Sequence, residues 1–167
     1  MTAVHRTDVT PDGFVRLVAS VPFAGQPAAA ARLLEDGAAA WDGEATGDAP
    51  GGLRRFAVDL RLRVGGPESG LLTFRKAAFL DIGQPKREGE RWTVEIAWRA
   101  ASAMPLFPVF SGQLSMAPGS LWISGLYAPP GGVVGRIADR ALLHVAANGT
   151  ARWVLTELER AARETPA

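Results

Sequence analysis

The chain has 167 residues, a length that suits one domain, and 47% of them are hydrophobic, as is typical of a globular protein. Its 18 Lys and Arg against 17 Asp and Glu leave a formal charge of +1, which gives no pull toward nucleic acid or an anionic membrane. The absence of cysteine excludes disulfides, thiolate catalysis and Cys-based metal sites. The polar start lacks an apolar signal core, and no apolar run approaches the ~20 residues that cross a bilayer. We therefore expect a cytoplasmic protein with no integral membrane segment and no nucleic-acid partner.

The first elements are predicted from propensity and turn residues. The segment FVRLVASVPF, at 14–23, is rich in β-branched and aromatic residues and predicts a strand. Residues 25–41 predict a helix, because Pro27 suits a first helical turn and the Ala, Leu, Arg and Glu residues favour helix. Gly37 either weakens the middle of this helix or splits it into two short ones. The segment DGEATGDAPGG, at 42–52, predicts a flexible acidic loop.

From residue 54 onward, apolar residues recur at every second position. In RRFAVDLRLRVGG, apolar residues alternate with Arg and Asp, which is the pattern of a half-buried strand with a charged outer face. Similar segments follow, with QPKREGE among the turns between them, and no helix fits between neighbours, so we expect antiparallel pairing. The five predicted strands are 54–66, 71–83, 91–100, 106–119 and 120–130. Their predicted inward residues include Phe56, Val58, Leu60, Leu62, Val64, Leu72, Phe74, Ala78, Leu80, Ile82, Trp92, Val94, Ile96 and Trp98.

The last segment predicts one long helix, from about Gly132 to Arg163. Pro129 and Pro130 cannot donate to a sheet ladder and so end the last strand, and the two glycines after them allow a sharp reversal. We expect the helix to fold back across the concave face of the sheet, with Gly125 leaving room for its approach. Its predicted apolar face consists of Val133, Ile137, His144, Ala151, Leu155, Leu158 and Ala162.

This order of elements predicts an α+β fold. A curved antiparallel sheet of about six strands (the first strand, one or two helices, then five strands) is expected to wrap around the long C-terminal helix. The helix is the one predicted element long enough to cover the apolar face of the sheet. We expect a flexible lead-in over residues 1–12 and a single domain over 13–165.

Four segments resemble a known superfamily over roughly residues 14–163. They are RKAAFLDIG, EIAWRAA, LFPVFSGQL and LYAPPGGVVGRIADRALLHVAANGTARW. They resemble the helix-grip fold of the START-like superfamily, also called SRPBCC, and are most similar to uncharacterised bacterial members. The superfamily includes polyketide cyclases, pollen-allergen-like proteins and lipid-transfer domains. The resemblance implies a cavity between sheet and helix that binds or transforms hydrophobic small molecules, and no universal catalytic residue carries over.

Polar residues on the inward faces are the first site candidates. His144 and Asn148 lie one turn apart on the helix face, either as polar anchors in the cavity or as satisfied side chains at the helix–sheet contact. Lys76 shares the parity of Phe74 and Ala78. It either points inward, where it meets an anionic head group or forms a Schiff base, or is turned outward by a β-bulge.

Apolar and aromatic residues complete the predicted site. They line the cavity or fill it as core, and they are Tyr127, Trp98, Phe110, Ile137 and Leu155. Trp122 and Leu126 fall on the opposite parity of the last strand. They form either a homodimer contact or isolated exposed apolar positions.

Three functions remain open. The first is binding of a hydrophobic or amphipathic small molecule, the second an interaction protein with a filled cavity, and the third a cyclase- or dehydratase-like enzyme that uses His144, Tyr127 or Lys76 as acid–base groups. We rank them in this order because no catalytic motif is present. A pocket of a few hundred Å³ favours binding over a filled core. We expect no cofactor and no metal, since His5 is the only other histidine and no acid shares the His144 face.

Overall fold

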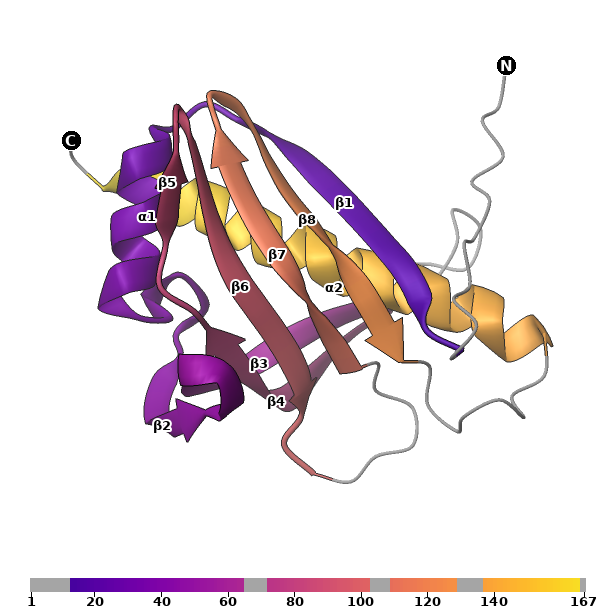
Figure 1. The fold of residues 1–167 in the computed structure, drawn as a ribbon. Coiled ribbons are helices and arrows are strands. Elements are labelled where there is room, and N and C mark those ends of the chain that lie inside the picture. Colours follow the sequence, from indigo (N-terminus) through magenta and orange to yellow (C-terminus); the bar gives the residue numbers. More distant parts are fainter. Residues whose placement is uncertain (1–12, 65–71, 103–108, 129–136, 166–167) are drawn as a thin grey trace, which may run out of the picture.

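The structure is a computed structural model that describes residues 13–64, 72–102, 109–128 and 137–165 (Figure 1). Side chains are described at the same positions except 62–64, 72–74 and 137–144. The predicted lead-in and the predicted reversal after the last strand lie outside the described residues.

Eight strands, two α-helices and two 3₁₀ turns are present in the described part of the chain. The strands are β1 (Val15–Phe23), β2 (Glu44–Ala49), β3 (Leu53–Val64), β4 (Leu72–Ile82), β5 (Lys86–Glu88), β6 (Arg91–Ala100), β7 (Val109–Ala117) and β8 (Gly119–Ala128). The helices are α1 (Pro27–Asp36) and α2 (Ile137–Glu164), and the 3₁₀ turns are η1 (Ala39–Trp41) and η2 (Pro50–Gly52).

All strands join one open, antiparallel sheet in the order β1-β8-β7-β6-β4-β3-β2, with β5 paired to β6 beside the end of β4. This confirms the α+β class and the antiparallel pairing of the five predicted strands, which are β3, β4, β6, β7 and β8. The predicted count of about six strands is wrong, because β2 and β5 are also part of the sheet.

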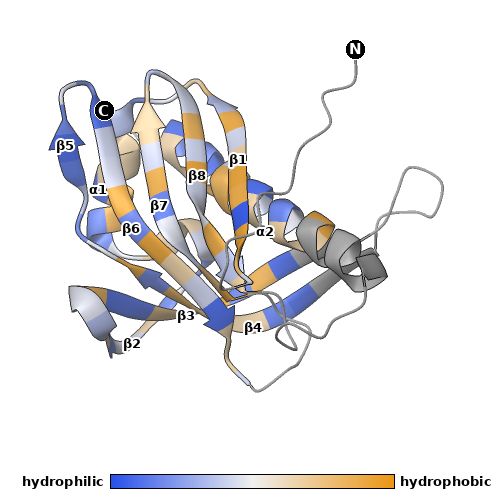
Figure 2. Cartoon of the chain, turned by 45° about the vertical axis from the view of Figure 1, so that its right-hand side comes forward, coloured by the Kyte–Doolittle hydropathy of each residue, from blue (hydrophilic) through white to orange (hydrophobic). Residues whose placement is uncertain are grey.

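The two missed strands carry little hydrophobic signal. The predicted loop at 42–52 contains β2, which pairs with β3, and five of the six residues of β2 are exposed. The predicted turn at 84–90 contains β5, whose three residues are all exposed and charged. Figure 2 shows β5 as a hydrophilic strand. Both segments are strands because their backbones pair with a neighbouring strand, and neither has the alternation of apolar residues from which a strand is predicted.

The inward faces of the strands form one packed layer. Cross-strand register places six buried residues in a row across the sheet, because opposite partners in an antiparallel pair share a face. The row is Phe56, Leu80, Trp98, Phe110, Tyr127 and Val15. The apolar residues of β3 and β4 that were predicted to face inward are all buried where their side chains are described, while Trp92 at the start of β6 is only half-buried.

A glycine pair makes room within this layer for an aromatic ring. Gly112 and Gly125 lie opposite each other in β7 and β8. A Cβ added to Gly112 would collide with the carbonyl oxygen of Ser124, and one added to Gly125 would collide with that of Ser111. Either Cβ would also stand 2.7 Å from Cζ of Phe110. The expectation that Gly125 makes room for the helix is therefore corrected: the neighbours that need the space are the backbone of the facing strand and the ring of Phe110.

Helix α2 contacts β1 and β3, which lie toward opposite ends of the sheet, and also β8 (Figure 1). Its buried face includes the predicted members Ala151, Leu155, Leu158 and Ala162. The helix is described from Ile137, and the predicted start at Gly132 lies outside the described residues. No helix among the described residues is long and apolar enough to cross a membrane.

The segment between β1 and β2 packs against both the sheet and α2. Helix α1 starts at Pro27 and ends before Gly37, whose φ of 139° favours glycine, and η1 follows, so the alternative of two short helices is confirmed. A Cβ on Gly43 would stand 2.9 Å from Cγ1 of Val58. The chain leaving η1 therefore lies directly against β3, and this close approach positions the site described next.

Candidate functional site

Four of the predicted pocket residues form a packed core. Trp98, Phe110, Tyr127 and Leu155 are each no more than 1% exposed and belong to one hydrophobic cluster. The rings of Trp98 and Phe110 stack with centroids 4.1 Å apart. None of the four lines the groove described below. The structure thus brings them together as core.

Burial changes the chemistry of the polar atoms in this core. Desolvation raises the pKa of Tyr127 to about 12, so its hydroxyl stays protonated well above the pH at which an exposed tyrosine ionises. The indole Nε1 of Trp98 is fully covered and has no hydrogen-bond partner among the described residues. Such an unpaired donor lowers stability by about 1–3 kcal/mol.

The other predicted polar residues are not gathered at one point. Asn148 is half-buried on α2. Lys76 pairs with Leu60 in a register that runs without a shift along β3 and β4, so the predicted β-bulge is wrong and Lys76 keeps the inward parity, half-buried. The backbone of His144 and Ile137 belongs to α2, but both side chains lie outside the described residues.

The outward face of β8 carries the two residues considered for a homodimer contact. Leu126 is 38% exposed, and Trp122 is half-buried opposite Ser115 of β7. On the neighbouring strand β1, Val18 also points outward and is 58% exposed. The homodimer stays a prediction.

A groove of about 430 Å³ lies where β3 leaves its pairing with β2. The β2–β3 ladder extends only to Glu44 opposite Ala57, and beyond this point the groove is bordered by η1, β3, β4 and α2. Its apolar lining includes the indoles of Trp41 and Trp153 together with Val58. The volume lies in the range of about 300–1,000 Å³ that small-molecule sites occupy.

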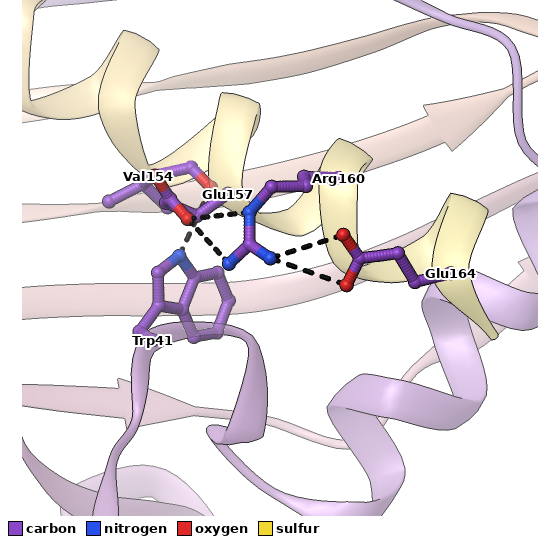
Figure 3. A network of polar contacts seen from close by, with 5 residues as sticks. All are labelled: Trp41, Val154, Glu157, Arg160 and Glu164. Carbon is purple, nitrogen blue, oxygen red and sulfur yellow. Dashed lines mark hydrogen bonds and ion pairs between the residues drawn. The ribbon is translucent and has the colours of Figure 1, made fainter.

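One wall of the groove is held by polar contacts along α2 (Figure 3). Nε1 of Trp41 donates a hydrogen bond of 3.1 Å to the carbonyl oxygen of Val154, which fixes η1 to the helix. Beside it, the Arg160 guanidinium donates to Glu157 at 2.9 and 3.1 Å and to Glu164 at 3.3 Å. The hydrogen bonds and charge of Glu157 and the charge of Glu164 raise the pKa of Arg160. The guanidinium of Arg160 is therefore shared by two carboxylates, which leaves this group of three side chains with a net negative charge.

The second indole of the groove is unpaired. Trp153 is 9% exposed, and its Nε1 is covered and has no hydrogen-bond partner among the described residues. The opposite rim carries Arg61 and Arg75, which face each other across β3 and β4, and the end near η1 carries Asp42 and Glu44. The groove thus combines aromatic walls with one basic and one acidic end.

The sequence pattern does not predict this groove. The alternation over 54–66 places Arg61 on the charged outer face of a strand, and no pattern gives Trp41 or Trp153 a role. The one available signal was the presence of two tryptophans, Trp41 and Trp153, that the predicted pocket left unused.

Among the described residues, no group of three or more His, Asp or Glu side chains is placed to hold a metal ion. The site residues of the groove are hydrogen-bond donors, carboxylates and indoles, which suit an organic ligand. No protein-family model matches the chain, and no curated protein is similar enough to count as a relative.

Proposed function

We propose that this protein is a START-like, helix-grip domain that binds a hydrophobic or amphipathic small molecule in the groove between β3, η1 and α2. The observation that carries the proposal is the groove itself: about 430 Å³, bordered by sheet and C-terminal helix and walled by two indoles. Apolar ligand surface packs on Trp41, Trp153 and Val58, and the polar end of the ligand meets the charged rim.

The stacked core supports placing the ligand in the groove and not deeper. Trp98 and Phe110 fill the inward face of β6 and β7, and a ligand there would have to displace a stacked pair. Tyr127, with a pKa of about 12, lies in the same packed row, which argues against a general base at that position.

The experiment fills the groove from its exposed side. Ala77 lines the groove and is exposed, so Ala77→Phe adds a ring without disturbing the core. Ala117→Phe, in the β7–β8 hairpin, is the matched control. Each variant is purified from the native host, and native mass spectrometry measures retained small molecules.

We expect added mass on the wild type and on Ala117→Phe, and loss of that mass from Ala77→Phe. Retention that is equal in all three proteins would contradict a site in the groove. A wild type that carries no added mass and binds no apolar or amphipathic probe would favour the second candidate function, an interaction protein with a filled core, which the Trp98–Phe110 stack supports.

A further inference from the structure

We propose that Arg61 and Arg75 bind the oxyanion head group, a carboxylate or phosphate, of the amphipathic ligand. This inference rests on the proposed function and assigns one end of the groove. Both side chains line the groove, from β3 and β4 respectively.

The first observation is a like-charge pair in the sheet. Arg61 and Arg75 are directly opposite in the antiparallel register, so their Cβ atoms are about 4.5–5.5 Å apart. Like charges at this spacing destabilise a strand pair. Among the described residues, neither guanidinium forms an ion pair or a hydrogen bond with another side chain. A bound anion would relieve this repulsion.

The same two strands also contain an arginine whose side-chain donors are paired with a carboxylate. Arg55, on the same outward face, lies opposite Asp81 and forms two hydrogen bonds of 2.8 Å with its carboxylate. Three outward pairs further along the same ladder, Arg61 lies opposite Arg75, so an arginine stands where the first pair has its aspartate. The bidentate geometry that Asp81 supplies to Arg55 is the one that a ligand carboxylate or phosphate supplies to Arg61 and Arg75.

The second observation is the hydrogen-bonding character of the two side chains. A guanidinium group carries N–H donors and no acceptor, so a ligand group that only accepts hydrogen bonds complements both arginines. An oxyanion is such a group.

The acidic residues of the groove do not neutralise the positive charge of Arg61 and Arg75. Asp59 lies between Ala57 and Arg61 on the outward face of β3, and one carboxylate beside two guanidinium groups leaves a net positive charge. Asp42 and Glu44 are at the η1 end of the lining. Glu157 is already paired with Arg160.

The test compares head groups on one alkyl chain. Isothermal titration calorimetry measures binding of decanoate, decyl phosphate, decanol and decyltrimethylammonium to the wild type and to Arg61→Gln/Arg75→Gln. Arg87→Gln is the matched control, because Arg87 is exposed on β5 and its one side-chain hydrogen bond within the described part of the chain goes to the carbonyl of Gly89. Thermal melts check folding, and loss of a like-charge pair should leave Tm unchanged or raised.

We expect decanoate or decyl phosphate to bind the wild type about tenfold more tightly than decanol, and the double variant to lose that advantage. Decanol affinity should be equal in all three proteins, and Arg87→Gln should behave as wild type. The two anions tell a carboxylate site from a phosphate site. If decanol binds as tightly as both anions, or the double variant keeps the anion preference, the inference is wrong while the proposed function stands. If none of the four compounds binds, both fail.

Discussion

Single residues show how burial sets their chemistry. Tyr127 is the only tyrosine of the chain, is 1% exposed, and lies in the cross-sheet row next to Phe110. Burial penalises the tyrosinate anion and raises its pKa to about 12, against an ordinary value of 10.0. The inward parity of this residue is predicted from the strand pattern, but the size of the pKa change depends on how closely neighbours from other strands cover the ring.

The first prediction concerns alkaline pH. Because the pKa of Tyr127 is higher in the folded than in the unfolded chain, its contribution to stability is fully present below pH 10 and is lost as pH rises through about 12. Ultraviolet absorbance of tyrosinate, followed in buffer and in urea, measures both pKa values, and Tyr127→Phe should remove the signal. A native midpoint near 10 would show that the hydroxyl is not desolvated.

At the scale of elements, the packing of α2 on the sheet holds the fold together. Leu155 is completely buried within the cluster that joins helix and sheet, whereas Val145 on the same helix is 48% exposed. Helical periodicity predicts which face is buried, and that face is confirmed for all its described members.

The second prediction measures that packing. Leu155→Ala should lower the free energy of unfolding by about 2–5 kcal/mol, since it leaves a cavity in a close-packed contact. Val145→Ala is the control and should change it by no more than about 0.5 kcal/mol. Urea unfolding measures both. Equal, small losses in the two variants would mean that the buried face of α2 is assigned wrongly.

Elements were predictable where an apolar period marks them. The alternation of Phe56, Val58 and Leu60 with charged residues is enough to predict β3, because burial of one face alone decides the pattern. The same reasoning fails for β2 and β5, whose residues are almost all exposed and whose pairing depends on backbone hydrogen bonds to strands already in place. At Lys76 the sequence suggests an irregularity that the structure does not contain. A charged residue at an inward position suggests a β-bulge, but the pairing of β3 with β4 continues through Lys76 without a shift in register.

For the whole molecule, the site is a product of the tertiary arrangement. The groove combines residues from η1, β3, β4 and α2, and Trp41 and Trp153 are 112 positions apart in the sequence. No local pattern predicts that an indole after an alanine-rich helix will bond to the carbonyl of Val154. The parity of the inward aromatic residues predicts that they either line a pocket or fill the core, and their burial shows that they fill it. Parity cannot decide between the two, because it gives the side of the sheet that a residue faces and not the free space there.

The central claim is that the ligand occupies the groove and not the sheet–helix core. The chain has five tryptophans, so its ¹⁵N–¹H correlation spectrum contains five indole signals, which single Trp→Phe variants assign. Titration with decanoate should shift the signals of Trp153 and Trp41, which line the groove, and leave that of Trp98 in place. A saturable shift of Trp98 with Trp41 and Trp153 unmoved would contradict the account and place the ligand inside the core.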